Sequence, residues 1–263
     1  MEQAIFISKI NNLKYVNGDF SRLYFGIEFC QNLIPSIEDV TVILKFIFER
    51  KIELTFVTPY LTNKGMGKIK PLLNYLIDKK SETEIVVNDW GLLKWIAYEH
   101  PESNLILGRL LNKQKRGPRI LNLAGRVPES MYSHFQMSNV DSSIFSNFLK
   151  NKNIKRVELD NLIQGIDRPK KSLKGSLYFP FGYVTTTRFC LSNFSIRDDI
   201  KVLRGVYECN KNCQNTMVKL KHKDMPIDLY LKGNTQFFKN DNVSKKLNHL
   251  NIDRLVFQPE IPL

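Results

Sequence analysis

The four cysteines are the residues whose type and spacing could support chemistry. They are Cys30, Cys190, Cys209 and Cys213, and the last two are separated by three residues in the stretch GVYECNKNCQN (205–215). Thiolates are the ligands that zinc and iron–sulfur clusters prefer. The sequence shows no secretory leader and no apolar run long enough to cross a bilayer, so we expect a cytoplasmic protein with reduced thiols. In that compartment, a few spaced cysteines indicate a metal or catalytic role more often than disulfides.

The cysteine pattern C-x159-C-x18-C-x3-C leaves four interpretations open. The residues could be unrelated buried cysteines, because a free cysteine is among the most buried residue types. They could form disulfides, which the compartment disfavours. They could bind a structural zinc ion, although only the last pair has the usual knuckle spacing. They could hold an iron–sulfur cluster, which accepts more scattered ligands because its irons are spread over a wider body.

The elements that must position these cysteines alternate between strands and helices. Ser36, with Asp39 three positions later, predicts a capping box at the start of a helix. Apolar runs predict strands at 22–29, 52–59, 83–89, 103–112 and 154–162, and helical periodicity predicts helices at 36–51, 67–80, 90–100 and 142–153. This alternation indicates βαβ units and a parallel sheet, arranged as a (β/α) barrel or as an open doubly wound sheet.

The last third of the chain has a different pattern. Residues 175–193 predict one more strand and its loop, and short β-type runs follow Cys209 with turns at Pro226 and at Gly233–Asn234. We expect a small β-rich extension, with a helix around 240–250. Cys30 and Cys190 each follow a predicted strand, and parallel strands all end on one face, so the two thiols could lie close together. If the segment from 209 to 213 is helical, its two thiols lie on one face as well.

Charged residues at predicted strand ends are the other candidates for a site. Glu28, Asp89, Arg109 and Glu158 are the candidate catalytic residues, and Asp160 lies near the last of them. The alternatives are structural: Asp89 could cap the following helix, and Glu28 could form a salt bridge with Arg109. Arg109 could also join Asn112 in holding an anionic substrate.

The net charge of +13 favours anionic partners such as RNA or nucleotides, although simple solubility explains it as well. Basic residues are dense at 112–119 and 167–174. The four histidines form no zinc-binding or protease motif, and no G-x-G-x-x-G, P-loop or G-x-S-x-G motif is present. The sequence therefore nominates no nucleotide fold and no hydrolase triad.

The order of several motifs resembles the peptidase U-32 family. These motifs are RLYFGIEFC, LTFVTPYLTNKG, EIVVNDWGLL, LILGRLLNKQ, YVTTTRFC and the closing C-x3-C pair, and they cover about residues 20–235. The chain is most similar to the short, single-domain branch typified by the ubiquinone-biosynthesis protein UbiV. It departs from that branch in its strongly basic charge and at 115–140.

The resemblance implies an α/β fold, a (β/α) TIM-like barrel that could be incomplete or distorted. It implies one domain over residues 1–263, with a cluster-binding segment at about 186–238. It also implies that Cys30, Cys190, Cys209 and Cys213 bind a 4Fe–4S cluster. The expected function is that of an oxygen-independent hydroxylase component acting on an aromatic or quinone precursor, in a heterodimer with a longer, UbiU-like U-32 protein.

Two alternatives remain beside that function. The chain could modify a tRNA or rRNA base by hydroxylation, or it could be a non-catalytic scaffold subunit with a four-cysteine metal site. Peptidase activity needs a nucleophile–base pair, and the sequence nominates none.

Overall fold

Eight parallel strands close into a barrel in the computed structural model, which describes residues 1–194 and 209–263. The order around the barrel is β1–β12–β7–β6–β5–β4–β3–β2. These strands are β1 (Glu2–Ile7), β2 (Arg22–Gly26), β3 (Glu53–Val57), β4 (Glu84–Val87), β5 (Asn104–Leu107), β6 (Arg156–Asp160), β7 (Lys174–Phe179) and β12 (Ile252–Phe257). The predicted (β/α) barrel is therefore confirmed.

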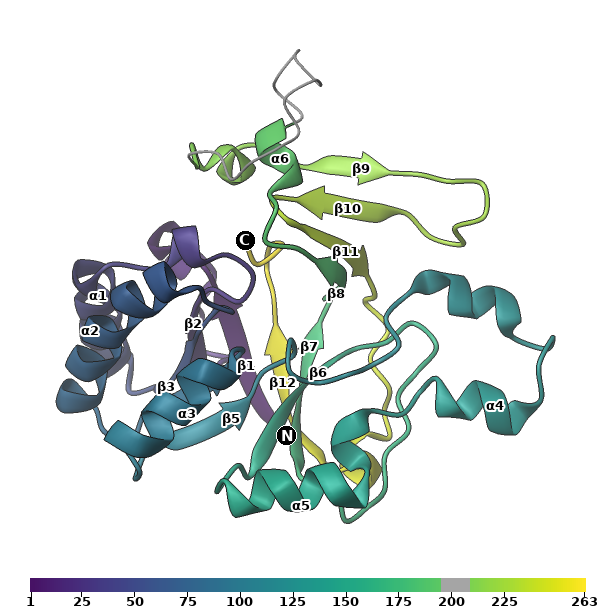
Figure 1. Cartoon of the computed structure of the whole chain (residues 1–263), viewed down its shortest axis with the longest axis horizontal. Helices are drawn as coiled ribbons and strands as arrows, with labels where there is room; N and C mark the ends of the chain where they lie inside the picture. The colour runs from purple at the N-terminus through teal and green to yellow at the C-terminus, as the bar shows by residue number, and fades with distance from the viewer. Residues whose placement is uncertain (195–208) are drawn as a thin grey trace.

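Helices cover only part of the barrel. Helices α1 (Ile37–Arg50), α2 (Asn63–Lys79) and α3 (Trp90–Glu99) follow β2, β3 and β4 and lie together on the left in Figure 1. Helix α5 (Ser143–Asn151) precedes β6, and the short α4 (Glu129–His134) lies on an arm away from the barrel. Within the described residues, the connection from β6 to β7 contains no helix. The helical layer is therefore incomplete, in agreement with the expected distortion.

Alternation along the strands separates two apolar cores. Ala4, Phe6, Tyr24, Tyr178 and Val256 belong to a cluster inside the barrel. Their neighbours in sequence, such as Ile5 and Leu23, belong to the larger cluster between the strands and the helices. Both faces of the strands are covered, as is usual for parallel sheets.

The predicted β-rich extension is an antiparallel sheet with the order β8–β11–β10–β9. Its strands are β8 (Phe181–Thr186), β9 (Val218–Leu220), β10 (Leu229–Lys232) and β11 (Thr235–Lys239). The sheet projects from the upper end of the barrel, beside the short helix α6 (Leu191–Phe194) (Figure 1).

Several boundaries differ from the sequence prediction. The capping box of Ser36 and Asp39 forms as predicted. The run at 175–193 contains two strands rather than one, because the chain turns at Pro180 and enters the second sheet. The predicted helix around 240–250 is limited to a 3-10 turn, η7 (Leu247–Leu250). Strand β12, expected in the extension, completes the barrel between β1 and β7.

No helix in the two described ranges is both long enough and apolar enough to span a membrane.

Candidate functional site

A group of four buried charged side chains closes the carboxyl end of the barrel. Arg109 donates through Nε to Glu28 Oε1 at 3.1 Å, and its Nη2 bonds the other oxygen of Glu28. Arg109 Nη1 lies 2.7 Å from Asp160 Oδ1, and Arg116 Nε lies 2.5 Å from Asp160 Oδ2. Two guanidinium groups therefore pair with two carboxylates where water cannot solvate them, and burial still raises the pKa of Glu28 against the opposing effect of Arg109.

Within this quartet of Arg109, Glu28, Asp160 and Arg116, the guanidinium group of Arg109 is paired with protein carboxylates. Its side chain is 0% exposed, and its guanidinium carbon lies 4.1 Å from the ring centre of Tyr178. Asn112 is buried too, since its amide donates to the Glu158 carbonyl at 3.0 Å and its oxygen accepts from Ser138. Both side chains are engaged by protein groups in this structure, and the anion site expected from these two residues stays a prediction. Glu28 forms a salt bridge with Arg109 in the structure, as the structural alternative for this residue predicted.

The remaining candidate carboxylates also have structural surroundings. Asp89 accepts from the backbone N–H of Leu92 at 3.0 Å and of Leu61 at 3.1 Å, so it caps α3 and holds the loop after β3. Glu158 lies in the middle of β6 rather than at its end, fully buried inside the barrel. Tyr24 donates to one of its oxygens at 3.1 Å, and burial raises the pKa of Glu158 to about 8.

The four cysteines lie on loops beyond the strand ends. Cys30 follows β2 and immediately precedes the 3-10 turn η2 (Gln31–Leu33). Cys190 lies between β8 and α6. Cys209 begins the second described range, and Cys213 is in the 3-10 turn η6 (Asn212–Gln214). Lys211, between them, has the left-handed φ of 56°, so the described pair does not continue one α-helix, and residues 205–208 of the motif lie outside the described residues.

The pKa of the Cys30 thiol depends on its burial and on the other three cysteines. Burial raises the pKa of the Cys30 thiol to about 11. The backbone of Asn32 opposes this rise, while Cys209, Cys213 and Cys190 each add to it. Cysteines from distant parts of the sequence therefore contribute to the electrostatics of Cys30.

These thiols are not bonded to one another. None of the four cysteines forms a disulfide. Among residues 1–194 and 209–263, no group of three or more His, Cys, Asp or Glu side chains is arranged to hold a metal ion. Within the described ranges, the cysteines therefore form no disulfide and are not arranged as an assembled metal site.

Asn234, in the turn between β10 and β11, ties together the loops that carry two of the cysteines. Its Nδ2 lies 2.7 Å from the carbonyl of Phe29, next to Cys30. It lies 2.5 Å from the carbonyl of Thr187, three residues before Cys190, and 2.9 Å from the hydroxyl of Tyr60. The amide thus fixes the relative positions of three loops from distant parts of the chain.

Gly233 connects the same turn to Cys213. Its φ of 61° is one that residues with a side chain rarely adopt. A Cβ at this position would lie 2.6 Å from Leu263 Cδ2 and 3.2 Å from Cys213 Cβ. Its carbonyl accepts the N–H of Ser192 at 3.1 Å, just after Cys190. The Gly233–Asn234 turn therefore contacts the chain close to Cys30, to Cys190 and to Cys213.

A cavity of about 510 Å³ opens beside this turn, at the carboxyl end of the barrel. Its lining includes aromatic side chains, basic side chains and the end of β8: Tyr60, Asn88, Asp89, Trp90, Leu110, Leu111, Lys113, Arg116 and Tyr183–Arg188. Cavities of this size commonly hold small-molecule ligands. We call it the mouth cavity.

The mouth cavity is electropositive. The guanidinium carbon of Arg188 lies 5.7 Å from the ring centre of Tyr60, and Arg188 Nη2 donates to the Leu61 carbonyl at 3.1 Å. No carboxylate of the described residues is within ion-pair distance of Arg188 or Lys113. Burial raises the pKa of Tyr60, and the nearby Cys30 adds to that rise, so this tyrosine lies between the thiols and the cavity.

The sequence analysis missed Asn234, Tyr60 and Arg188. The sequence identified Asn234 only as part of a predicted turn, and Tyr60 follows Pro59 in a segment that contains no recognisable motif. Arg188 lies two residues before Cys190, which is the signal that could have identified it.

Comparisons with known proteins give one structural likeness. No family model and no curated protein matches the sequence. The solved structure of the U32 peptidase Mk0906 aligns with 100% of this chain and 94% of its own, at 9% sequence identity and a TM-score of 0.47. These values do not establish that the chain belongs to that family.

Proposed function

We propose that Cys30, Cys190, Cys209 and Cys213 bind a 4Fe–4S cluster and that the mouth cavity beside them receives the substrate. The observation that carries this proposal is the Gly233–Asn234 turn, which bonds residues next to Cys30 and close to Cys190 and approaches Cys213. Three of the four cysteines thus lie on segments that meet at one turn, although Cys30 and Cys190 are 160 residues apart in the sequence. Two observations on the donor set and its surroundings support the proposal.

The donor set suits a cluster. All four ligands would be thiolates, the donors that hold 4Fe–4S clusters. Three of the cysteines are partly exposed and Cys213 is buried, so the group is shielded but reachable. Because metal binding removes the thiol proton, a cluster would eliminate the cost that burial places on a Cys30 thiolate.

The surroundings also suit an anionic group. Arg188 and Lys232 supply positive charge near the cysteine loops, and Lys232 interacts electrostatically with Cys213. The Gly233–Asn234 turn holds the loops in place, as residues around a metal ligand commonly do. A structural zinc site remains the competing assignment, because the same thiolates could bind it.

A bound cluster would pass electrons or activate an oxygen donor. The chain's own residues would bind and orient the substrate. Arg188 and Lys113 would attract a negatively charged group, and Tyr60, Trp90 and Tyr183 would contact a planar one. The quartet around Arg109 would seal the cavity from the barrel interior.

We therefore propose an oxygen-independent hydroxylase component acting on an anionic aromatic or quinone precursor. The order of its U-32-like motifs favours this function, and a longer protein of that family is the proposed partner. Base modification of RNA is a second candidate, favoured by exposed Lys113, Lys115 and Arg119 near the cavity. Arg116 does not contribute to such a surface, since it is buried against Asp160.

Cysteine variants test the cluster. We expect Cys209→Ala and Cys213→Ala, prepared without oxygen, each to lose most of the bound iron. His249→Ala, a histidine away from the cysteine loops, is the control and should retain it. Full iron retention in both cysteine variants would remove these residues as ligands. A fall of RNA affinity with salt, with a slope near one per phosphate contact, would favour the second candidate.

A further inference from the structure

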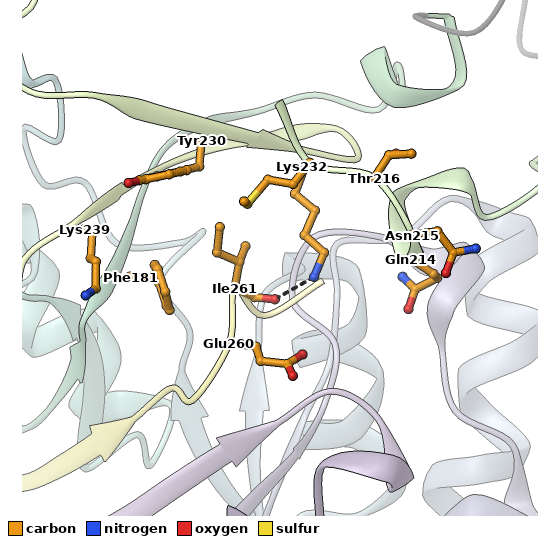
Figure 2. A pocket seen from close by; sticks show the side chains of 10 residues that line it. Phe181, Gln214, Asn215, Thr216, Tyr230, Lys232, Lys239, Glu260 and Ile261 are labelled. Atoms are coloured by element: carbon orange, nitrogen blue, oxygen red, sulfur yellow. Dashed lines mark hydrogen bonds between the residues drawn. The ribbon is translucent and has the colours of Figure 1, made fainter. Parts of the chain in front are cut away.

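A second cavity, of about 440 Å³, lies between the antiparallel sheet and the last residues of the chain. Figure 2 shows Phe181, Tyr230 and Lys239 on one side of it and Gln214–Thr216 on the other, with Lys232 reaching down from the sheet toward Ile261. We call it the sheet cavity. It shares none of its lining residues with the mouth cavity.

Lys232, the last residue of β10, is the unusual residue of this cavity. It is 9% exposed, and its Nζ donates to the Ile261 carbonyl at 3.1 Å. An ammonium group has three donors, and this carbonyl also accepts the N–H of Leu263 at 2.8 Å. No carboxylate of the described residues is within ion-pair distance of Lys232. Lysines are almost never this buried without an ionic partner.

The two other charged side chains of the sheet cavity have hydrogen-bond or ion-pair partners of their own, and Lys232 also helps to lower the pKa of Glu260 without forming a direct ion pair with it. Glu260 accepts from the hydroxyl of Tyr15 at 3.0 Å and from the amide of Asn12 at 3.2 Å. Lys239 lies 3.0 Å from Asp241. Lys232 is therefore the cation that a ligand entering this cavity would neutralise.

The side chains that line the sheet cavity indicate the shape and polarity of a ligand that would fit it. Phe181, Tyr230 and Ile261 present rings and methyl groups to the space around Lys232, and Met217 adds an exposed thioether. A single buried cation pairs best with a single negative charge, because a doubly charged phosphate would leave one charge unpaired in apolar surroundings. The volume suits a ligand of the size of one ring with a short side chain.

We propose that the sheet cavity binds a small monocarboxylate with a planar apolar body. Its carboxylate would pair with the Lys232 ammonium, and its ring would lie against Tyr230 and Phe181. The proposal goes beyond the cluster site and the mouth cavity, and Lys232 is the residue that the sheet cavity shares with the surroundings of Cys213. Burial lowers the pKa of Lys232 to about 8, which leaves the charged form predominant at pH 7.

The test uses the full chain and the matched probes 3-phenylpropionate and 3-phenylpropanamide, which differ in charge and not in shape. Calorimetric titration at pH 7 should give binding of the acid at least tenfold tighter than that of the amide. Lys232→Met should remove this preference. Lys219→Met is the control, because Lys219 lies on the same sheet but pairs with Asp228 outside the cavity, and it should leave the affinity unchanged.

Thermal unfolding supplies a second measurement. We expect 3-phenylpropionate to raise the melting temperature of the wild type and of Lys219→Met, but not that of Lys232→Met. Equal affinity for acid and amide would overturn the proposal, even if Lys232→Met failed to fold. Absence of binding by 3-phenylpropionate, benzoate and indole-3-acetate alike would overturn it as well. The experiment is run on metal-free protein, so failure of the cluster proposal cannot cause either outcome.

Discussion

Replacing Asn234 by Asp tests whether the turn between β10 and β11 holds the cysteine loops together. The substitution keeps the size of the side chain and exchanges its NH2 group for an oxygen. That oxygen would face the carbonyls of Phe29 and Thr187, which now lie 2.7 and 2.5 Å from Nδ2. Attraction at these two contacts would become repulsion.

The expected loss of stability follows from these contacts. An amide has two hydrogens, so Asn234 can satisfy about two of its three neighbouring acceptors at once. A buried hydrogen bond contributes about 1 kcal/mol net, and an acceptor left unsatisfied costs about 1–3 kcal/mol. We therefore expect the free energy of unfolding of the metal-free protein to fall by about 2–4 kcal/mol.

Asn161→Asp is a matched control. Asn161 and Asn234 are both 6% exposed, and the Nδ2 of Asn161 donates to two carbonyls, those of Asn240 and Asn242 at 3.2 and 3.0 Å. This control should lose a similar amount of stability. It contacts none of the cysteine loops, so it should bind iron like the wild type.

The assay combines denaturant unfolding with iron retention. After anaerobic reconstitution, Asn234→Asp should release iron to a chelator at least tenfold faster than the wild type and Asn161→Asp. Asn234→Leu removes the donors without adding charge and should behave like Asn234→Asp. If Asn234→Asp is destabilised yet retains iron as the control does, the turn does not organise the site and the reasoning is refuted.

Three further predictions follow from buried groups. Arg109→Met should lower the free energy of unfolding by about 3–5 kcal/mol, measured with denaturant, because it leaves buried carboxylates unpaired. Adding Glu28→Gln should recover part of that loss. No recovery would contradict the pairing of Glu28 with Arg109. The pKa of Glu158 is raised to about 8 in the folded state, whereas its ordinary value is 4.5. The folded state therefore keeps a proton that the unfolded state releases. For this reason the contribution of Glu158 to stability falls as the pH rises from about 5 to 8. Glu158→Gln should therefore stabilise the protein progressively over that range, and a constant difference from wild type would contradict the assignment. Gly233→Ala should lower the melting temperature and iron retention together, because its Cβ would collide with Leu263 and crowd Cys213; unchanged values would show that the turn tolerates a side chain.

The sequence predicted the barrel because its local signals agree with the fold. The apolar runs that become β2 to β6 are buried on both faces, and Ser36 and Asp39 form the capping box that starts α1. Strand β12 was placed in the wrong sheet because Arg254, which points into the barrel, interrupts its apolar pattern. Arg254 is tolerated there only through ion pairs to Glu2 and Glu84, which no local pattern reveals.

The site was predictable only in part. The cysteines and their positions after strands were visible in the sequence, and their joint role as ligands stays a prediction. The partners of Arg109 were not visible, since Glu28 is 81 residues away and Asp160 is 51. The role of Asn234 depends on three loops meeting at one amide, which is a property of the closed barrel and its added sheet. Long-range polar contacts of this kind are fixed by topology and leave no trace in local spacing.

The content of iron and acid-labile sulfide in anaerobically purified protein decides whether the four cysteines hold a 4Fe–4S cluster. A 4Fe–4S protein should contain about four of each per chain and show a broad absorption near 400 nm that dithionite bleaches. We expect this result for the wild type and its loss when Cys30 or Cys190 is replaced by Ala. A colourless protein with one zinc ion per chain, or one with no metal after reconstitution with iron and sulfide, would contradict it.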